Sequence, residues 1–163
     1  MSSSTTSIEG VAINVGMAQV ALIGGADIAR TVLGSCLGVV LYHRRLNNAA
    51  VAHIVLPYSG LHAGPPGKFA DTAVPHMLDL LAAEGALRHE LVAKVTGGAN
   101  VLAGSGPMQI GKENYSATAR LLRELRLPIV AEHIGGTKGR RVTFEGDTGN
   151  LRIETIGEPE IVI

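Results

Sequence analysis

Two residues of this sequence could together carry out nucleophilic chemistry. Cys36 is the only cysteine among 163 residues, and it ends the segment Leu-Gly-Ser-Cys just before an apolar run. His53 lies in a second apolar run, Ala-Val-Ala-His-Ile-Val-Leu-Pro. A lone cysteine before an apolar strand is more often a small buried side chain than a nucleophile, because reactivity needs a base and partial exposure. A neutral imidazole within hydrogen-bond reach would be that base and would favour a thiolate near neutral pH.

The elements around these two residues predict how they could meet. Residues 37–42 and 50–56 favour strands, the polar residues 43–48 separate them, and Pro57 ends the second run. Directly opposed residues of an antiparallel hairpin share a face. If Cys36 lay opposite His53, the turn would be centred between Arg44 and Arg45, inside the polar segment. A slip of one residue would place the two side chains on opposite faces.

A third group is needed to hold the imidazole ring. Thr31 precedes the Leu-Gly-Ser-Cys segment and could offer a hydroxyl, whereas Asp27 or Glu132 could offer a carboxylate. The residues alone leave the choice among these three open.

The rest of the chain favours an α+β domain. Strands are expected at residues 15–23, 91–95 and 129–132, and a hairpin at 141–144 and 151–156. Apolar residues at helical spacing predict helices at 68–84 and 112–125. Because the strands gather in hairpins and do not alternate regularly with helices, antiparallel or mixed sheets are favoured over a Rossmann-type sheet. The short tail after Gly157 is expected to add an edge strand or to contact another chain.

Length, charge and composition exclude several classes of function. Residues 1–10 are expected to be disordered and residues 11–163 to form a single domain.

Fourteen basic residues balance fourteen acidic ones, which argues against nucleic-acid binding. No apolar stretch approaches the roughly 20 residues that span a bilayer, so no membrane insertion and a cytoplasmic location are expected. The six histidines lack the spacing of a zinc site, and neither a metal nor a cofactor is expected.

Several segments resemble, in order along the chain, the chemoreceptor glutamine deamidase family, CheD. They are RTVLGSCLGVVLYH, AHIVLP, KFADTAVPHML, KVTGGANV, IGKEN and GGTKGRRVTF. The resemblance implies hydrolysis of particular glutamines on methyl-accepting chemotaxis proteins to glutamate, with Cys36, His53 and Thr31 as the catalytic residues. It also implies a three-layer α/β/β arrangement. Relatives in this family bind a CheC-type phosphatase, so an adaptor with little catalysis of its own is the alternative function.

The chemistry of amide hydrolysis sets one further requirement on the site. The tetrahedral oxyanion needs main-chain N–H donors, and the N–H of Cys36 with a neighbouring one from the Gly34-Ser35 turn is the expected source. Ser35 itself is expected to be a turn residue, since strand alternation directs its side chain away from the face of Cys36.

Overall fold

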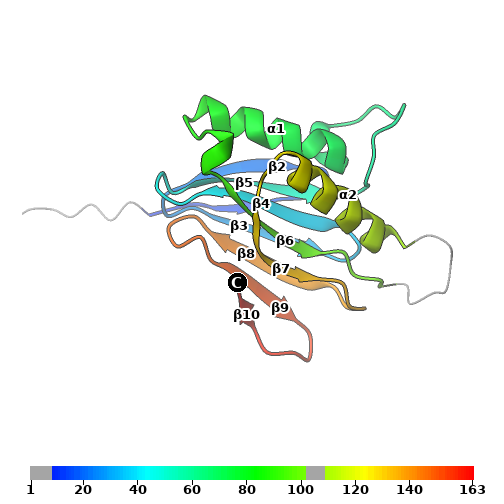
Figure 1. The fold of residues 1–163 in the computed structure, drawn as a ribbon. Helices are drawn as coiled ribbons and strands as arrows, with labels where there is room; N and C mark the ends of the chain where they lie inside the picture. Colours follow the sequence, from blue (N-terminus) through cyan, green and yellow to red (C-terminus); the bar gives the residue numbers. More distant parts are fainter. Residues whose placement is uncertain (1–8, 102–108) are drawn as a thin grey trace, which may run out of the picture.

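The computed structural model describes residues 9–101 and 109–163, which form three layers (Figure 1). One outer layer is a sheet of strand order β1-β3-β8-β9-β10, and the middle layer is a sheet of order β2-β5-β4-β6-β7. Two helices cover the other face of the middle sheet. The strands are β1 (Ala12–Asn14), β2 (Val20–Gly24), β3 (Ile28–Leu33), β4 (Leu37–His43), β5 (Asn48–Ile54), β6 (Val92–Gly97), β7 (Ile129–Ile134), β8 (Arg140–Glu145), β9 (Leu151–Thr155) and β10 (Ile161–Val162). Parallel pairs β1-β3 and β6-β7 make both sheets mixed, so the predicted α+β class with three layers is confirmed.

The helices form where their apolar spacing predicts them. They are α1 (Ala70–Ala83) and α2 (Ile110–Glu124), and short 3-10 turns η1 (Pro66–Lys68) and η2 (Arg88–Glu90) precede α1 and β6. Ala73, Met77 and Leu81 recur every four residues and bury one face of α1 against the middle sheet. α2 does the same with fewer apolar residues, among them Leu122. No helix of the described residues is long and apolar enough to cross a membrane.

A second apolar layer lies between the two sheets. Its fully buried members include Leu33, Val40, Phe144 and Ile153. Because the middle sheet is covered on both faces, every residue of β4 is buried, as is typical of a central strand. Truncating Phe144 to alanine should cost about 3–5 kcal/mol of folding free energy, since a cavity would remain between the sheets.

The β4–β5 hairpin forms as predicted, but its register differs from direct opposition of Cys36 and His53. His53 lies opposite Gly38, and the turn is centred between Arg45 and Leu46. The expected direct opposition is therefore wrong by two residues. Since side chains alternate with a period of two, this displacement leaves Cys36 and His53 on the same face.

The turn explains this register. It comprises residues 44–47, and Asn47 has a φ of 49°. Asparagine adopts the left-handed region more readily than most residues with a side chain, so the chain reverses with Asn47 at the end of the turn. A left-handed Asn47 at the last turn position is consistent with a turn centre one place beyond the predicted site.

The strand that carries Thr31 is missing from the sequence-based prediction. No element is predicted at residues 28–33, where the structure has β3, although Ala29, Thr31 and Leu33 are buried in alternation with exposed Arg30 and Val32. That alternation is a strand signal. The strand predicted at 15–23 is wrong over residues 15–19, because β2 begins only at Val20.

The other predicted strands correspond to β6, β7, β8 and β9, and the tail forms β10 at the sheet edge beside β9. An edge strand was one of the two roles expected for that tail. The prediction of a disordered N-terminus concerns residues 1–10, of which 1–8 lie outside the described residues.

Candidate functional site

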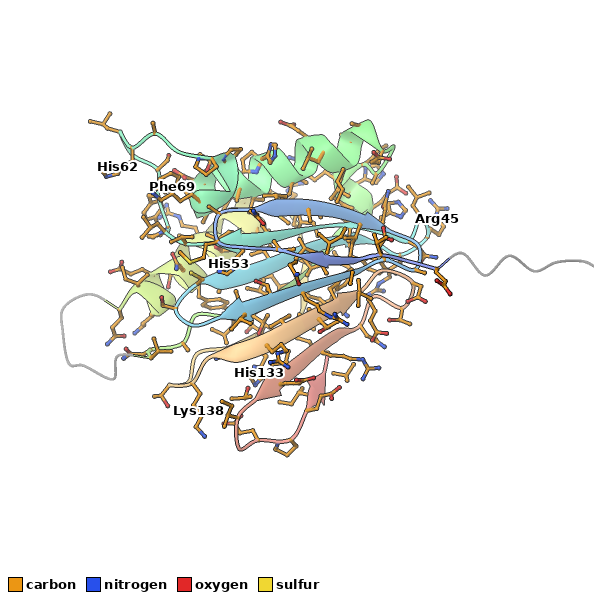
Figure 2. All side chains as sticks on the ribbon, turned by 180° about the vertical axis from the view of Figure 1, so that it is seen from behind. Arg45, His53, His62, Phe69, His133 and Lys138 are labelled. Atoms are coloured by element: carbon orange, nitrogen blue, oxygen red, sulfur yellow. The ribbon has the colours of Figure 1, made fainter. Side chains whose placement is uncertain are left out.

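Three predicted site residues enter the apolar layer between the sheets. Cys36, directly before β4, is half-buried and packs against this layer. His53 in β5 is 4% exposed, and its neighbour two residues earlier, Val51, belongs to the same layer. Thr31 comes from β3 of the other sheet and is 8% exposed. The site is thus assembled from both sheets, and His53 lies toward the end away from Arg45 (Figure 2).

The His53 ring is held through one nitrogen. Nδ1 lies 2.8 Å from the Thr31 Oγ1 and 3.2 Å from the Val15 carbonyl oxygen. The Thr31 hydroxyl donates its hydrogen bond to the same Val15 carbonyl at 2.7 Å. Because a hydroxyl has a single proton, Thr31 must accept from His53, and this assigns the proton of the neutral ring to Nδ1. Nε2 then has the free lone pair that a general base needs.

Burial disfavours the charged forms of both His53 and Cys36. It lowers the pKa of His53 below the ordinary 6.5, against the smaller opposing effect of the Val15 carbonyl. It raises the pKa of the Cys36 thiol above the ordinary 9.0. Both directions follow from the cost of placing a charge in a poorly solvated site. The surroundings therefore do not favour the thiolate that the sequence leads us to expect near neutral pH.

Cys36 and His53 are diagonal neighbours across the two strands. Diagonal residues of a sheet are about 7–8 Å apart, with Cβ atoms somewhat closer. Gly38, directly opposite His53, has no side chain, and a Cβ placed there would lie 2.8 Å from Leu33 Cδ1. No hydrogen bond joins the Cys36 sulfur to His53 among the described residues. Such bonds are often long before substrate binds and shorten in the reactive complex.

The Gly34-Ser35 turn presents main-chain donors beside Cys36. The N–H groups of Ser35 and Cys36 donate to no acceptor among the described residues, whereas the Cys36 carbonyl accepts from Gly98 at 2.9 Å. Ser35 lines a cavity of about 510 Å³ on the α2 side, away from the layer that Cys36 enters. Gly97 has a φ of 101°, and a Cβ there would lie 2.4 Å from the Cys36 carbonyl oxygen, so only glycine fits this approach.

The two carboxylates considered for the third role lie elsewhere. Asp27 accepts hydrogen bonds from the N–H group of Gly24 three residues earlier and from that of Val11, just before β1. Glu132 accepts from the Tyr115 hydroxyl at 2.6 Å. Of the three candidates only Thr31 contacts His53. Within residues 9–101 and 109–163, no three His, Cys, Asp or Glu side chains gather closely enough to hold a metal ion.

Two groups at the site escaped sequence reasoning. The Val15 carbonyl contacts both Thr31 and His53, and no sequence pattern marks a main-chain oxygen. Asn114 in α2 is fully buried and donates to the carbonyls of Ser35 and Val55. The signal for Asn114 was available, since a residue with low helix propensity lies inside a predicted helix.

Comparison with known proteins places the chain in a family. The family model described as CheD chemotactic sensory transduction matches residues 55–155, a span that begins after His53. A protein of Halalkalibacterium halodurans named chemoreceptor glutamine deamidase CheD is 42% identical over 91% of this chain and 98% of its own length. Two further relatives are each named a probable chemoreceptor glutamine deamidase CheD. The one from Clostridium botulinum is 36% identical over 92% of this chain and 96% of its own length. The one from Methanococcus vannielii is 38% identical over 86% of this chain and 93% of its own length. The chain belongs to the CheD family.

Proposed function

We propose that this chain hydrolyses glutamine side chains of methyl-accepting chemotaxis receptors to glutamate, with Cys36 as nucleophile and His53 as base. The names of the relatives support the reaction and the receptor substrate. The observation that carries the roles is the hydrogen bond between His53 Nδ1 and Thr31. It leaves the lone pair of Nε2 free to accept a proton, on a residue that shares a face of the β4–β5 hairpin with Cys36.

The first half of the reaction forms a thioester. The Cys36 sulfur attacks the carboxamide carbon while His53 Nε2 takes the thiol proton. The carbonyl oxygen becomes an oxyanion, which the N–H groups of Ser35 and Cys36 stabilise. When the C=O bond re-forms, the C–N bond breaks, and His53 gives its proton to the departing nitrogen. Ammonia leaves, and the acyl group stays on Cys36.

The second half returns the enzyme to its starting state. Water attacks the thioester carbon and gives a proton to His53 Nε2. The second oxyanion collapses, the C–S bond breaks, and the sulfur takes the proton back from His53. One amide and one water become one carboxylic acid and one ammonia, so the chemistry needs no cofactor. Thr31 keeps the ring oriented throughout, since its hydroxyl accepts from Nδ1 whether the ring is neutral or charged.

The test measures ammonia from purified protein and receptors, together with a mass increase of about 1 Da for each converted glutamine, because thioester hydrolysis replaces an amide by an acid. Cys36→Ala should remove both signals and keep the fold, since a small side chain replaces a small one. Conversion by Cys36→Ala at the parent rate would show that Cys36 is not the nucleophile. Receptor binding by the parent protein without ammonia would favour the alternative, an adaptor for a CheC-type phosphatase.

A further inference from the structure

Asn114 is a polar side chain that the reaction above does not use. It is 0% exposed, and its Nδ2 donates to the Ser35 carbonyl at 3.1 Å and to the Val55 carbonyl at 3.0 Å. An amide nitrogen has two protons, so both are engaged. One acceptor directly precedes the nucleophile, and the other follows the strand that carries His53.

The amide of Asn114 lies close to Cys36 because α2 packs tightly against the loop after β6. Asparagine is a poor helix former, and its Oδ1 has no partner among the described residues, so the position is costly for α2 alone. One turn earlier, Gly111 lies against the loop after β6. A Cβ on Gly111 would lie 2.5 Å from the Gly98 carbonyl oxygen and 2.7 Å from that of Ala99. The glycine lets the helix approach closely enough for Asn114 to reach between the two strand ends.

The consequence concerns a single peptide group. The Ser35 carbonyl and the Cys36 N–H are the two ends of one planar trans peptide, and they point in opposite directions. Because Asn114 holds the carbonyl toward α2, the N–H points away from α2, to the side where Cys36 enters the layer between the sheets.

We propose that Asn114 is a positioning residue that aims the Cys36 N–H at the oxyanion through the Ser35 carbonyl. The inference rests on the proposed deamidation. The second hydrogen bond, to the Val55 carbonyl, connects the same amide to the end of the strand that carries His53. One side chain therefore helps to position both the Cys36 N–H and the proposed base. Asn114 touches neither substrate nor sulfur and acts only through the main chain.

The test separates oxyanion stabilisation from thiol reactivity. Deamidation passes through an oxyanion, whereas alkylation of Cys36 by iodoacetamide needs the thiolate and access but forms no oxyanion. For Asn114→Ala, kcat should fall about 10- to 100-fold, somewhat less than on removal of an oxyanion donor. KM should stay within about twofold, because the interaction acts in the transition state. The alkylation rate of Cys36 should follow the same curve against pH as in the parent protein.

Thr118→Val is the matched control. Thr118 lies one turn further along α2, is also 0% exposed, and its Oγ1 has no hydrogen-bond partner among the described residues. This variant removes a buried polar atom from the same helix without touching the Ser35 carbonyl. It should leave both kcat and alkylation unchanged, and an equal loss of kcat in both variants would overturn the proposal.

Other outcomes are equally decisive. Parent-like kcat in Asn114→Ala, or a loss of alkylation that matches the loss of kcat, would overturn the role of Asn114 and leave the proposed deamidation intact. A parent protein that is alkylated at Cys36 but releases no ammonia would overturn both. If Asn114→Ala does not fold, Asn114→Asp replaces it, because the new carboxyl has the same shape and donates one hydrogen bond only when protonated. The ratio of the kcat of Asn114→Asp to that of the parent protein should then rise as pH falls. If this ratio did not change with pH, the proposal would be overturned.

Discussion

Two buried histidines lie near opposite ends of the β4–β5 hairpin, and burial does not distinguish them. His43 ends β4 and is 3% exposed, while His53 lies one residue before the end of β5 and is 4% exposed. Both come from the middle sheet. The sequence places His43 in the polar turn and His53 in an apolar strand, so the burial of His43 is not predicted.

Their partners make the difference. The His43 Nε2 lies 2.9 Å from a Glu90 carboxylate oxygen, and its Nδ1 accepts from the Leu46 N–H at 3.1 Å. Both nitrogens of His43 are therefore occupied. The described partners of the His53 ring, Thr31 and the Val15 carbonyl, both lie at Nδ1. A buried histidine becomes a candidate base when one nitrogen is fixed, the other is left with its lone pair, and a nucleophile shares the same layer.

Replacing each histidine by asparagine should give the largest contrast. His53→Asn should lower kcat about 10²- to 10⁴-fold, as loss of a general base does, with a much smaller change in KM. His43→Asn should keep kcat but lower the free energy of unfolding, because the buried ring and its hydrogen bonds to Glu90 and Leu46 are lost. Ammonia release and urea denaturation measure the two effects. An unchanged kcat with weakened receptor binding in His53→Asn would mean that the ring contacts the receptor and is not the base.

Removal of the Thr31 hydroxyl should give the next largest effect. Thr31→Val keeps the shape of the side chain but loses the acceptor for Nδ1, and kcat should fall roughly tenfold, as for other groups that orient a functional histidine. Thr31→Ser should restore most of the rate because it keeps the hydroxyl. Asp27→Asn should change little, since the described partners of that carboxylate are the N–H groups of Val11 and Gly24 and not His53. The opposite ranking of Thr31→Val and Asp27→Asn in a turnover assay would transfer the third role to Asp27.

The sequence predicts the local parts of this site better than the parts that join distant segments. The strands of Cys36 and His53 are predictable because they are apolar, adjacent and separated by a polar turn. Their register is not, because it depends on the backbone conformation of Asn47. Both side chains keep a common face only because the error is two residues and not one.

Contacts between the layers cannot be derived from local pattern. Thr31 reaches His53 because β3 pairs with β8 of the other sheet and that sheet packs across the middle one. Spacing along the chain does not specify such packing, so the choice among Thr31, Asp27 and Glu132 stays open until the fold is known. Asn114 is further away in sequence, and its described hydrogen bonds go to the main-chain carbonyls of Ser35 and Val55. Every residue has such a carbonyl, so the residue types at positions 35 and 55 do not reveal the contact.

The pH dependence of kcat should reflect the environment of His53. Its pKa is lowered below 6.5 by burial, so the ring stays neutral, and able to accept a proton, through pH 6.5. The rate should therefore decline only at lower pH, where the ring becomes protonated in the folded protein. A profile of kcat against pH measures this limb. A midpoint above 6.5 would indicate a ring stabilised as imidazolium, as expected beside a carboxylate and not beside Thr31.

The smallest effect is expected at the carboxylate of the other histidine. The hydrogen bond from His43, with further help from Arg45, holds the pKa of Glu90 below its ordinary 4.5. A lowered pKa in the folded protein means that the carboxylate adds stability above pH 4.5 and that this stability is lost as pH falls through the lowered pKa. Glu90→Gln should therefore slightly lower the urea midpoint at neutral pH, with a difference that shrinks on acidification and with kcat unchanged. A difference that stays constant with pH would indicate lost packing, and a fall in kcat would mean that the His43 end of the hairpin also supports catalysis.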